Sequence, residues 1–254
     1  MRRAAALLAV AAPLTMGQAK PVLVPDVSQR AIEIAYSFTG ADLLLFGAIL
    51  YPGGQVPAGE KPADIVVVVR GPTQSILLRE KEKVAGIWVN AASARYRSAP
   101  SFYAIASSRP IQTIVDERQR AIYELGVDSL QLSPVSTAPA DVQARFGQGL
   151  VELKTRAGLY VENPRAVEIT DGVLYRARVT IPARVPVGRF TAETFLIRDG
   201  RVLAAAVRDI DIRKSGFERF VARAAQRAGL LYGLVAVALS VGLGWIAGTI
   251  ARRV

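Results

Sequence analysis

The sequence predicts a mainly β protein: an immunoglobulin-like β-sandwich with a helical insertion, followed by a C-terminal amphipathic helix and one transmembrane helix. Three observations lead to this fold class. Short runs of β-branched and aromatic residues, separated by Gly, Pro and Asp-Gly turns, recur from residue 20 to residue 212, which is typical of sandwich proteins. Two helical patterns interrupt these runs between residues 112 and 157. Residues 228–251 then contain no charged side chain.

The N-terminal segment, residues 1–19, has the composition of a secretory signal peptide. Two arginines precede a short apolar stretch, and small residues precede Lys20. This order of positive, apolar and small-residue regions predicts export, with cleavage after Ala19. The alternative is an uncleaved anchor, although the apolar stretch is short for a membrane span and contains Pro13.

Residues 20–212 are expected to form the exported β-rich domain. Its clearest hairpins turn at Asp171-Gly172 and Asp199-Gly200, because Asp-Gly suits a type I′ turn, in which both central residues have positive φ. Apolar and polar side chains alternate from Val173 to Ile181, so one face of that strand should be buried. The other predicted strands are Ala31–Phe38, Leu43–Leu50, Ile65–Val69, Ser75–Leu78, Ile87–Asn90, Phe102–Ala106, Val167–Ile169, Phe190–Ile197 and Val202–Ile212.

Two helices are predicted inside the β-rich domain, from Gln112 to Leu125 and from Asp141 to Arg156. Gly126 and Gly158 stand where these helices would end. We interpret the pair as an insertion, about residues 112–157, in one sandwich. Two small β domains joined by helices remain the alternative.

Residues 213–227 are predicted to form an amphipathic juxtamembrane helix. Ser215 and Glu218 have the spacing of a capping box, and apolar residues then recur at helical intervals. The alternative is a continuous solvated extension of the membrane anchor. Residues 228–251 are predicted to span a bilayer, since an uncharged helix of this length exceeds the hydrocarbon thickness of about 30 Å. Exported chains with one such span leave the last residues, 252–254, in the cytoplasm.

Small residues form a stripe along the predicted span, at Ala236, Ser240, Gly244 and Gly248. Small residues four apart allow a second membrane helix to approach closely. We therefore predict a helix-packing face for another membrane protein at these four positions. Chance spacing in an Ala- and Gly-rich segment is the alternative.

The composition narrows the function classes. The chain has no Cys and no His, which excludes disulfides and cysteine metal clusters and removes the commonest general base. The formal net charge is +11, but residues 20–212 hold 23 basic against 20 acidic residues. The remaining excess flanks the apolar segments, where anionic lipid headgroups explain it better than nucleic acid does. No catalytic or cofactor-binding motif is present, and we predict neither enzymatic activity nor a cofactor.

Ser107, Ser108 and Arg109 form the candidate anion-binding site. Hydroxyl groups beside a guanidinium can hold an oxyanion, because Arg offers a planar fork of permanently charged donors. The alternative is a strand end with a surface arginine. Asp209 and Asp211 share one strand face and could bind a hard cation, or they form its solvated side.

Five segments carry a resemblance to known proteins: Ser37-Phe38-Thr39-Gly40-Ala41, Leu45-Phe46-Gly47-Ala48, Gly86-Ile87-Trp88-Val89-Asn90, Pro100-Ser101-Phe102-Tyr103-Ala104 and Leu231-Tyr232-Gly233-Leu234. With these segments the chain resembles a family of alphaproteobacterial transmembrane proteins of unknown function. The resemblance covers the chain after residue 20 and implies no catalytic residues. Members of that family look to be encoded near sulfite-exporter-like permeases, and the resemblance therefore implies a role in the export of sulfur compounds.

Together these observations predict a single-pass protein of the bacterial inner membrane with its main domain in the periplasm. Its partners are expected to be the lipid bilayer and another membrane protein. We expect a non-enzymatic accessory of a membrane transporter, or alternatively a tethered binding module for a sulfur oxyanion; a hydrolase is a third, weaker possibility. Trp88 and Tyr103 are expected in the core rather than at a ligand site.

Overall fold

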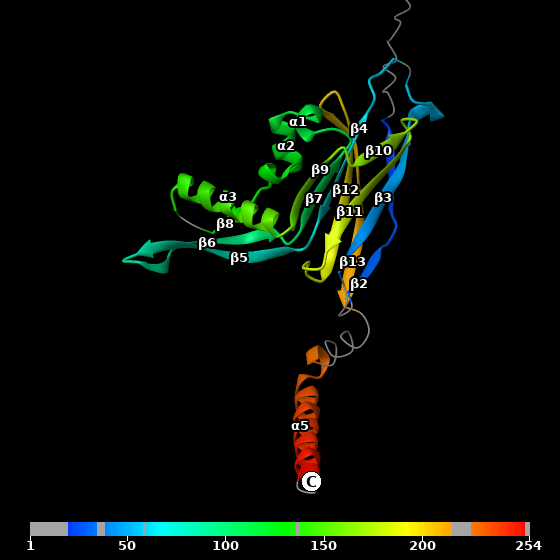
Figure 1. Ribbon diagram of the computed structural model, residues 1–254. Coiled ribbons are helices and arrows are strands. Elements are labelled where there is room, and N and C mark those ends of the chain that lie inside the picture. The colour runs from blue at the N-terminus through cyan, green and yellow to red at the C-terminus, as the bar shows by residue number, and fades with distance from the viewer. Residues whose placement is uncertain (1–19, 35–38, 58, 136–137, 215–224, 252–254) are drawn as a thin grey trace, which may run out of the picture.

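The computed structural model describes residues 20–34, 39–57, 59–135, 138–214 and 225–251 (Figure 1). Strands dominate this part of the chain and form three sheets, with four, six and three strands. The prediction of a mainly β protein is therefore confirmed. The predicted signal peptide, most of the predicted amphipathic helix 213–227 and the tail 252–254 lie outside the described residues.

Two of the sheets pack face to face around the largest core cluster. The four-stranded sheet runs in the order β1 (Val22–Val27), β3 (Gly40–Leu50), β11 (Leu174–Pro182) and β10 (Val167–Thr170). The six-stranded sheet runs in the order β2 (Ala31–Ile34), β13 (Arg201–Lys214), β12 (Gly188–Arg198), β4 (Asp64–Arg70), β7 (Tyr103–Ser107) and β9 (Tyr160–Pro164).

Buried and exposed side chains alternate along the strands, and this alternation explains the core. In β11 every second side chain, from Tyr175 to Ile181, is buried against the six-stranded sheet. Asp171 and Asp199 have positive φ angles of 53° and 48°, and the glycines after them have 67° and 75°. Both Asp-Gly turns therefore have the predicted conformation, and they join β10 to β11 and β12 to β13.

The central strand β4 is buried on both faces, as its continuous β-branched sequence predicts. Ile65, Val67 and Val69 belong to the core between the two sheets. Val66 and Val68 point the other way, into a second core that includes Ile111 and other residues of the helical segment. Strand β4 thus connects the sandwich to the layer that covers it.

The strand pairing departs from an immunoglobulin-type sandwich, whose sheets are antiparallel. Strands β7 and β9 pair in parallel, and so do β13 and β2. Two parallel neighbours need a long crossover connection, and residues 108–159 supply it between β7 and β9. The predicted helical insertion is therefore a crossover that covers one face of the six-stranded sheet.

The first helix of this crossover differs from its prediction. The segment Gln112–Leu125 contains two helices, α1 (Ile111–Ile114) and α2 (Glu117–Tyr123). They are separate because Val115 is extended and Asp116 begins a new helix by accepting a hydrogen bond from the Gln119 amide. The short 3-10 helix η2 (Val127–Ser129) follows, and α3 (Ala140–Arg156) matches the second predicted helix.

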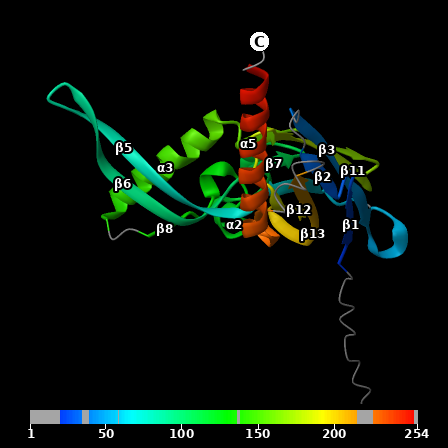
Figure 2. The same cartoon turned by 90° about the horizontal axis from the view of Figure 1, so that it is seen from below.

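The third sheet and α3 form an arm that extends away from the sandwich (Figures 1 and 2). The sheet has the order β5 (Thr73–Val84), β6 (Ile87–Pro100) and β8 (Ser133–Pro134). A separate core cluster holds α3 on this sheet, through Phe146 and Leu150 against Ala94, Tyr96 and Ala99. The predicted strands here, Ser75–Leu78 and Ile87–Asn90, are much shorter than β5 and β6, so the length of this hairpin is a new finding.

The prediction of a transmembrane helix is wrong for the part of the chain that the structure describes. None of the helices described there combines the length and the apolar character needed to cross a membrane. Helix α5 (Gly229–Ala251) occupies the segment in question. The prediction relied on the absence of charge, and that criterion counts glycines such as Gly242 as apolar although they add almost no apolar side-chain area.

Two glycines allow a matched test of the packing. A Cβ at Gly47 would lie 2.6 Å from the Tyr175 hydroxyl and would also clash with the Val24 carbonyl. We expect Gly47→Ala to reduce the free energy of unfolding by about 2–3 kcal/mol through overpacking.

In helix α3 a Cβ at Gly149 would meet only Leu78, at 3.9 Å. Gly149→Ala should instead stabilise by about 0.5–1 kcal/mol through helix propensity. Denaturant unfolding measures the change in the free energy of unfolding for Gly47→Ala and for Gly149→Ala. Equal changes in the two variants would contradict this packing.

Candidate functional site

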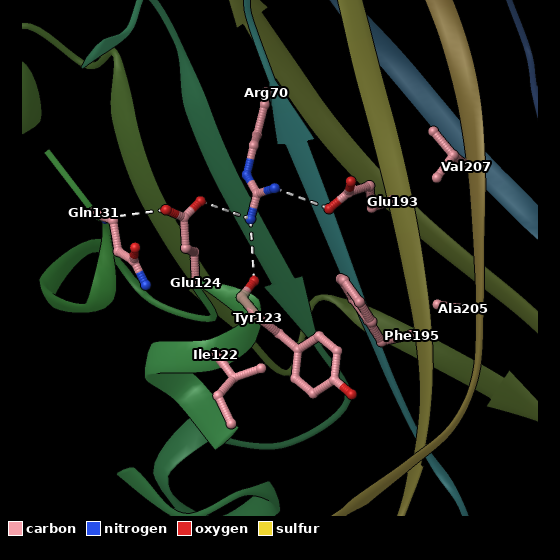
Figure 3. A pocket seen from close by; sticks show the side chains of 9 residues that line it. All are labelled: Arg70, Ile122, Tyr123, Glu124, Gln131, Glu193, Phe195, Ala205 and Val207. Carbon is pink, nitrogen blue, oxygen red and sulfur yellow. Dashed lines mark hydrogen bonds and ion pairs between the residues drawn. The ribbon is translucent and has the colours of Figure 1, made fainter. Parts of the chain in front are cut away.

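Arg70, the last residue of β4, lies at the centre of the first candidate site (Figure 3). Its Nη1 donates to Glu193 Oε2 at 3.0 Å, and its Nη2 lies 3.4 Å from Glu124 Oε2. Nη2 also donates to the Tyr123 carbonyl at 3.1 Å. These contacts connect β4 to β12 and to the end of α2.

Backbone geometry positions the acceptors of this cluster. Glu124 has a positive φ of 51° at the end of α2, which turns the chain back across the sheet. The Tyr103 hydroxyl holds this turn by donating to the Glu124 carbonyl at 2.7 Å and accepting from the Gly126 amide at 3.0 Å. Burial raises the pKa of Tyr103 far above its ordinary value, so the hydroxyl keeps its proton.

The Arg70 cluster faces a pocket of about 320 Å³. Its walls are partly apolar, and one guanidinium faces two carboxylates there, so the local charge is negative. Protein oxygens already occupy both terminal nitrogens of Arg70, while its buried Nε has no acceptor among the described residues. The cluster therefore acts as a clamp between strands and helix and presents no free cation to an anion. The lining residues are Arg70, Ile122, Tyr123, Glu124, Gln131, Glu193, Phe195, Ala205 and Val207.

The predicted anion site lies at the opposite end of β4. Ser108 donates to Asp64 Oδ1 at 2.7 Å, and the Arg109 guanidinium binds both carboxylate oxygens of Asp64, at 2.9 and 2.5 Å. The Ser107 hydroxyl is buried and donates to the Arg109 carbonyl at 2.6 Å. The structure thus brings the three predicted residues together, around a carboxylate of the protein itself.

Asp64 was not among the predicted residues of this site. It begins β4 and is 8% exposed, and an acidic residue directly before a buried β-branched run was the only signal of its role. Its carboxylate raises the pKa of Arg109 through a bidentate hydrogen bond. Arg109 also faces a pocket of about 640 Å³, lined by Lys61, which forms a 3.0 Å ion pair with Asp199.

The other sequence candidates are spread over the chain. Asp211 pairs with Arg213 and Asp209 is exposed, and no group of metal-binding side chains occurs among the residues that the structure describes. Tyr103 is buried as expected, but Trp88 is exposed, so the expectation of a core position for Trp88 is wrong.

The predicted helix-packing face lies on α5. Ala236 and Ser240 are joined by a hydrogen bond of 2.9 Å from the Ser240 hydroxyl to the Ala236 carbonyl, within the helix itself. Gly244 and Gly248 are exposed, and a Cβ at either would meet nothing within 4 Å. The described part of the chain brings no partner to these four positions.

A larger groove lies on the arm, between α3 and the segment that contains η2 and β8. Its volume is about 900 Å³, and a Cβ at Gly147 would lie 3.7 Å from the Tyr96 hydroxyl at its floor. Small residues on this side of α3 keep the groove open. The groove is lined by Tyr96, Val127, Asp128, Leu130, Gln131, Leu132, Pro134, Gln143, Ala144, Gly147, Gln148, Val151 and Glu152.

Comparisons with known proteins give one extensive match. The model of a family described as "Putative transmembrane protein (Alph_Pro_TM)" matches residues 22–253. No curated protein matches the chain. Among solved structures, the sporulation control protein Spo0M from Bacillus subtilis is similar at 9% identity and a TM-score of 0.30. That similarity covers 82% of this chain and 56% of Spo0M, and at this level it transfers neither fold nor function.

Replacing Arg70 tests the clamp. Arg70→Met keeps the aliphatic stem but leaves Glu124 and Glu193 without their counter-ion, so we expect a loss of about 1–3 kcal/mol in the free energy of unfolding. Arg70→Met combined with Glu193→Gln should recover part of this loss, because one uncompensated charge is gone. Chemical denaturation measures the cycle, and strictly additive losses would contradict a coupled cluster.

Replacing Asp64 tests whether the protein fills its own anion site. Asp64→Asn should release the Arg109 fork and bring sulfate affinity up at least tenfold over the native chain, measured by calorimetry. Adding Arg109→Gln should abolish the gain. If the native chain already binds sulfate as tightly as Asp64→Asn does, then Asp64 does not occupy the site.

Proposed function

The chain belongs to the family whose model matches residues 22–253, and from that premise we propose that it is a non-enzymatic accessory of a membrane transporter. The observation that carries this proposal is the arm, formed by β5, β6, β8 and α3. The arm has its own core cluster and extends away from the sandwich (Figure 2). An appendage of this kind enlarges the surface available to a partner without contributing to the central core.

The chemistry of the arm groove suits a polypeptide segment. Apolar side chains such as Val127 and Leu132 alternate around the groove with glutamines and the acidic Asp128 and Glu152. Apolar walls with a few polar groups give a partner both contact area and orientation. The acidic groups favour a partner segment that carries basic residues, and a periplasmic loop of a transporter with such residues would fit the groove.

The charged clusters of the sandwich support a role without catalysis. Arg70 and Arg109 are each occupied by carboxylates of the protein, so neither is free to polarise a substrate. The transporter class implied by the family resemblance is a permease for sulfur compounds, and we propose it as the first partner to test. The signal-peptide composition of residues 1–19 supports a periplasmic location for the β-rich domain.

Photocrosslinking in native membranes tests the partnership. A photoreactive amino acid at Gln148, which lines the groove, should crosslink to the transporter. The same probe at Arg178, exposed on β11 of the four-stranded sheet, serves as the control and should not. Ala144→Arg, which places a basic side chain in this acidic groove without touching the core, repels a basic partner segment and should reduce the Gln148 crosslink at least tenfold.

The result that would contradict the proposal is equal crosslinking from Gln148 and Arg178, or a Gln148 crosslink that Ala144→Arg leaves unchanged. Circular dichroism of the Ala144→Arg chain checks that the fold is retained. Ala144 is exposed, so the substitution should change stability by no more than about 0.5 kcal/mol.

A membrane-associated anion-binding module is the second candidate. It is favoured by the Arg109 side chain, which is 55% exposed despite its pair with Asp64, and by Lys61 in the same pocket. An oxyanion would have to share or displace the Asp64 contact. Sulfite, sulfate and thiosulfate titrated into the full chain distinguish this candidate from the first, because transporter crosslinking at Gln148 does not depend on Arg109.

A further inference from the structure

The tip of the β5–β6 hairpin exposes a cluster of large apolar side chains. Val84, Ile87 and Trp88 are 55%, 69% and 65% exposed, and Val89 is exposed as well. Helix α3 shields the same hairpin nearer the sandwich, where Leu78 contacts the helix region and Arg145 pairs with Glu80 at 3.0 Å. Every residue from Lys81 to Asn90 is exposed, so the described part of the protein does not cover this cluster.

The apolar side chains lie on both faces of the ribbon. Val84 pairs with Ile87 and Lys83 pairs with Trp88, and residues opposite each other in an antiparallel ladder share a face. Successive pairs alternate between the faces. Val84 and Ile87 therefore project from one side and Trp88 from the other. A flat protein surface can cover only one of these sides, whereas a fluid medium surrounds both.

Charge is also sorted between the two faces. Arg79, Lys81 and Lys83 are two residues apart along β5, so they share the face of Trp88. Glu80 and Glu82 occupy the opposite face. One side of the hairpin is thus a basic row that ends in a tryptophan. This arrangement is complementary to anionic headgroups, with the tryptophan ring at their depth.

The backbone of the tip is suited to a shallow position in a bilayer. A two-residue turn closes the hairpin, with positive φ angles of 50° at Ala85 and 86° at Gly86, and the flanking residues are paired across the strands. The outer edges of the two strands near the tip have no neighbouring strand among the described residues. Unpaired edge groups are costly in hydrocarbon, so the tip should remain at headgroup depth.

We propose that the β5–β6 tip, residues 81–90, inserts into the interface of an anionic lipid membrane, with Trp88, Ile87 and Val84 in the interface and the basic row along the headgroups. This function goes beyond the transporter partnership and does not depend on it. The family that the chain belongs to is described as one of transmembrane proteins, which makes a bilayer the first surface to test. The tip therefore acts as a contact that orients the arm relative to the membrane surface.

Trp88 itself provides the readout. Trp88 and Trp245 are the two tryptophans of the chain, so Trp245→Phe leaves Trp88 as the only indole. The full chain carrying Trp245→Phe is mixed with vesicles of phosphatidylcholine and phosphatidylglycerol in about a 3:1 ratio. We expect the Trp88 emission to shift to the blue by about 10 nm, as an indole does on leaving water for the interface. Lipids brominated near the carbonyl end of the acyl chain should quench it more than lipids brominated near the methyl end.

Two pairs of variants, in the Trp245→Phe chain, separate the apolar from the electrostatic contribution. Val84→Ser with Ile87→Ser should abolish the blue shift, whereas Leu77→Ser, an exposed apolar residue of the same strand, should not. Lys81→Gln with Lys83→Gln should weaken the response to anionic vesicles at least fivefold. Lys61→Gln with Arg176→Gln removes the same charge from exposed positions elsewhere and should leave the response unchanged.

Three outcomes would overturn the proposal. Trp88 emission that vesicles neither shift nor quench would show that the tip stays in water. A blue shift that rises with protein concentration in the absence of lipid would identify a second copy of the chain as the occupant. A shift that appears only when the transporter is present in the vesicles would assign the tip to a protein partner. The transporter crosslink at Gln148 is measured separately, so the two proposals can fail independently.

Discussion

Burial of β4 on both faces is the constraint on which the rest of the structure depends. Ile65, Val67 and Val69 fill the space between the two sheets, and Val66 and Val68 require cover on the other side. The crossover from β7 to β9 supplies that cover with α1, α2 and η2. Because the crossover must return to a parallel neighbour of β7, it has enough length to carry α3 as well, and α3 in turn supports the β5–β6 hairpin.

An ion cluster lies at each end of β4. Asp64 begins the strand and binds Arg109, and Arg70 ends it and binds Glu124 and Glu193. Both arginines are thus paired with carboxylates of the protein itself, so that neither is a buried charge without a counter-ion. The arm, in contrast, exposes apolar and basic side chains that have no such partners in their own cluster among the described residues and offers them to other molecules.

Local signals in the sequence predicted much of the fold. Asp171-Gly172 and Asp199-Gly200 form the expected turns, β4 is buried as its β-branched run predicts, and α3 lies where helical periodicity placed it. These features depend on neighbours within about ten residues. The predicted membrane span was wrong, because absence of charge is a weaker criterion than apolar side-chain area.

Contacts between residues that are far apart in the sequence could not be predicted from local sequence patterns. Asp64 and Arg109 are 45 positions apart, and Arg70 and Glu193 are 123 apart, so no spacing rule could pair them. The parallel pair of β7 and β9 likewise depends on a crossover of some fifty residues. Trp88 was assigned to the core because aromatic residues are usually buried, and only the length of the hairpin beyond α3 shows why it is exposed.

The central claim is that the arm, rather than the sandwich, is the surface on which this protein meets other molecules. Hydrogen–deuterium exchange of the full chain, compared between native membranes and the purified state, tests it most directly. The account predicts additional protection in the membranes for the amides of α3 and of the hairpin tip, with no change in β10 and β11. Protection that appears on β10 and β11 while the arm exchanges equally in both states would contradict it.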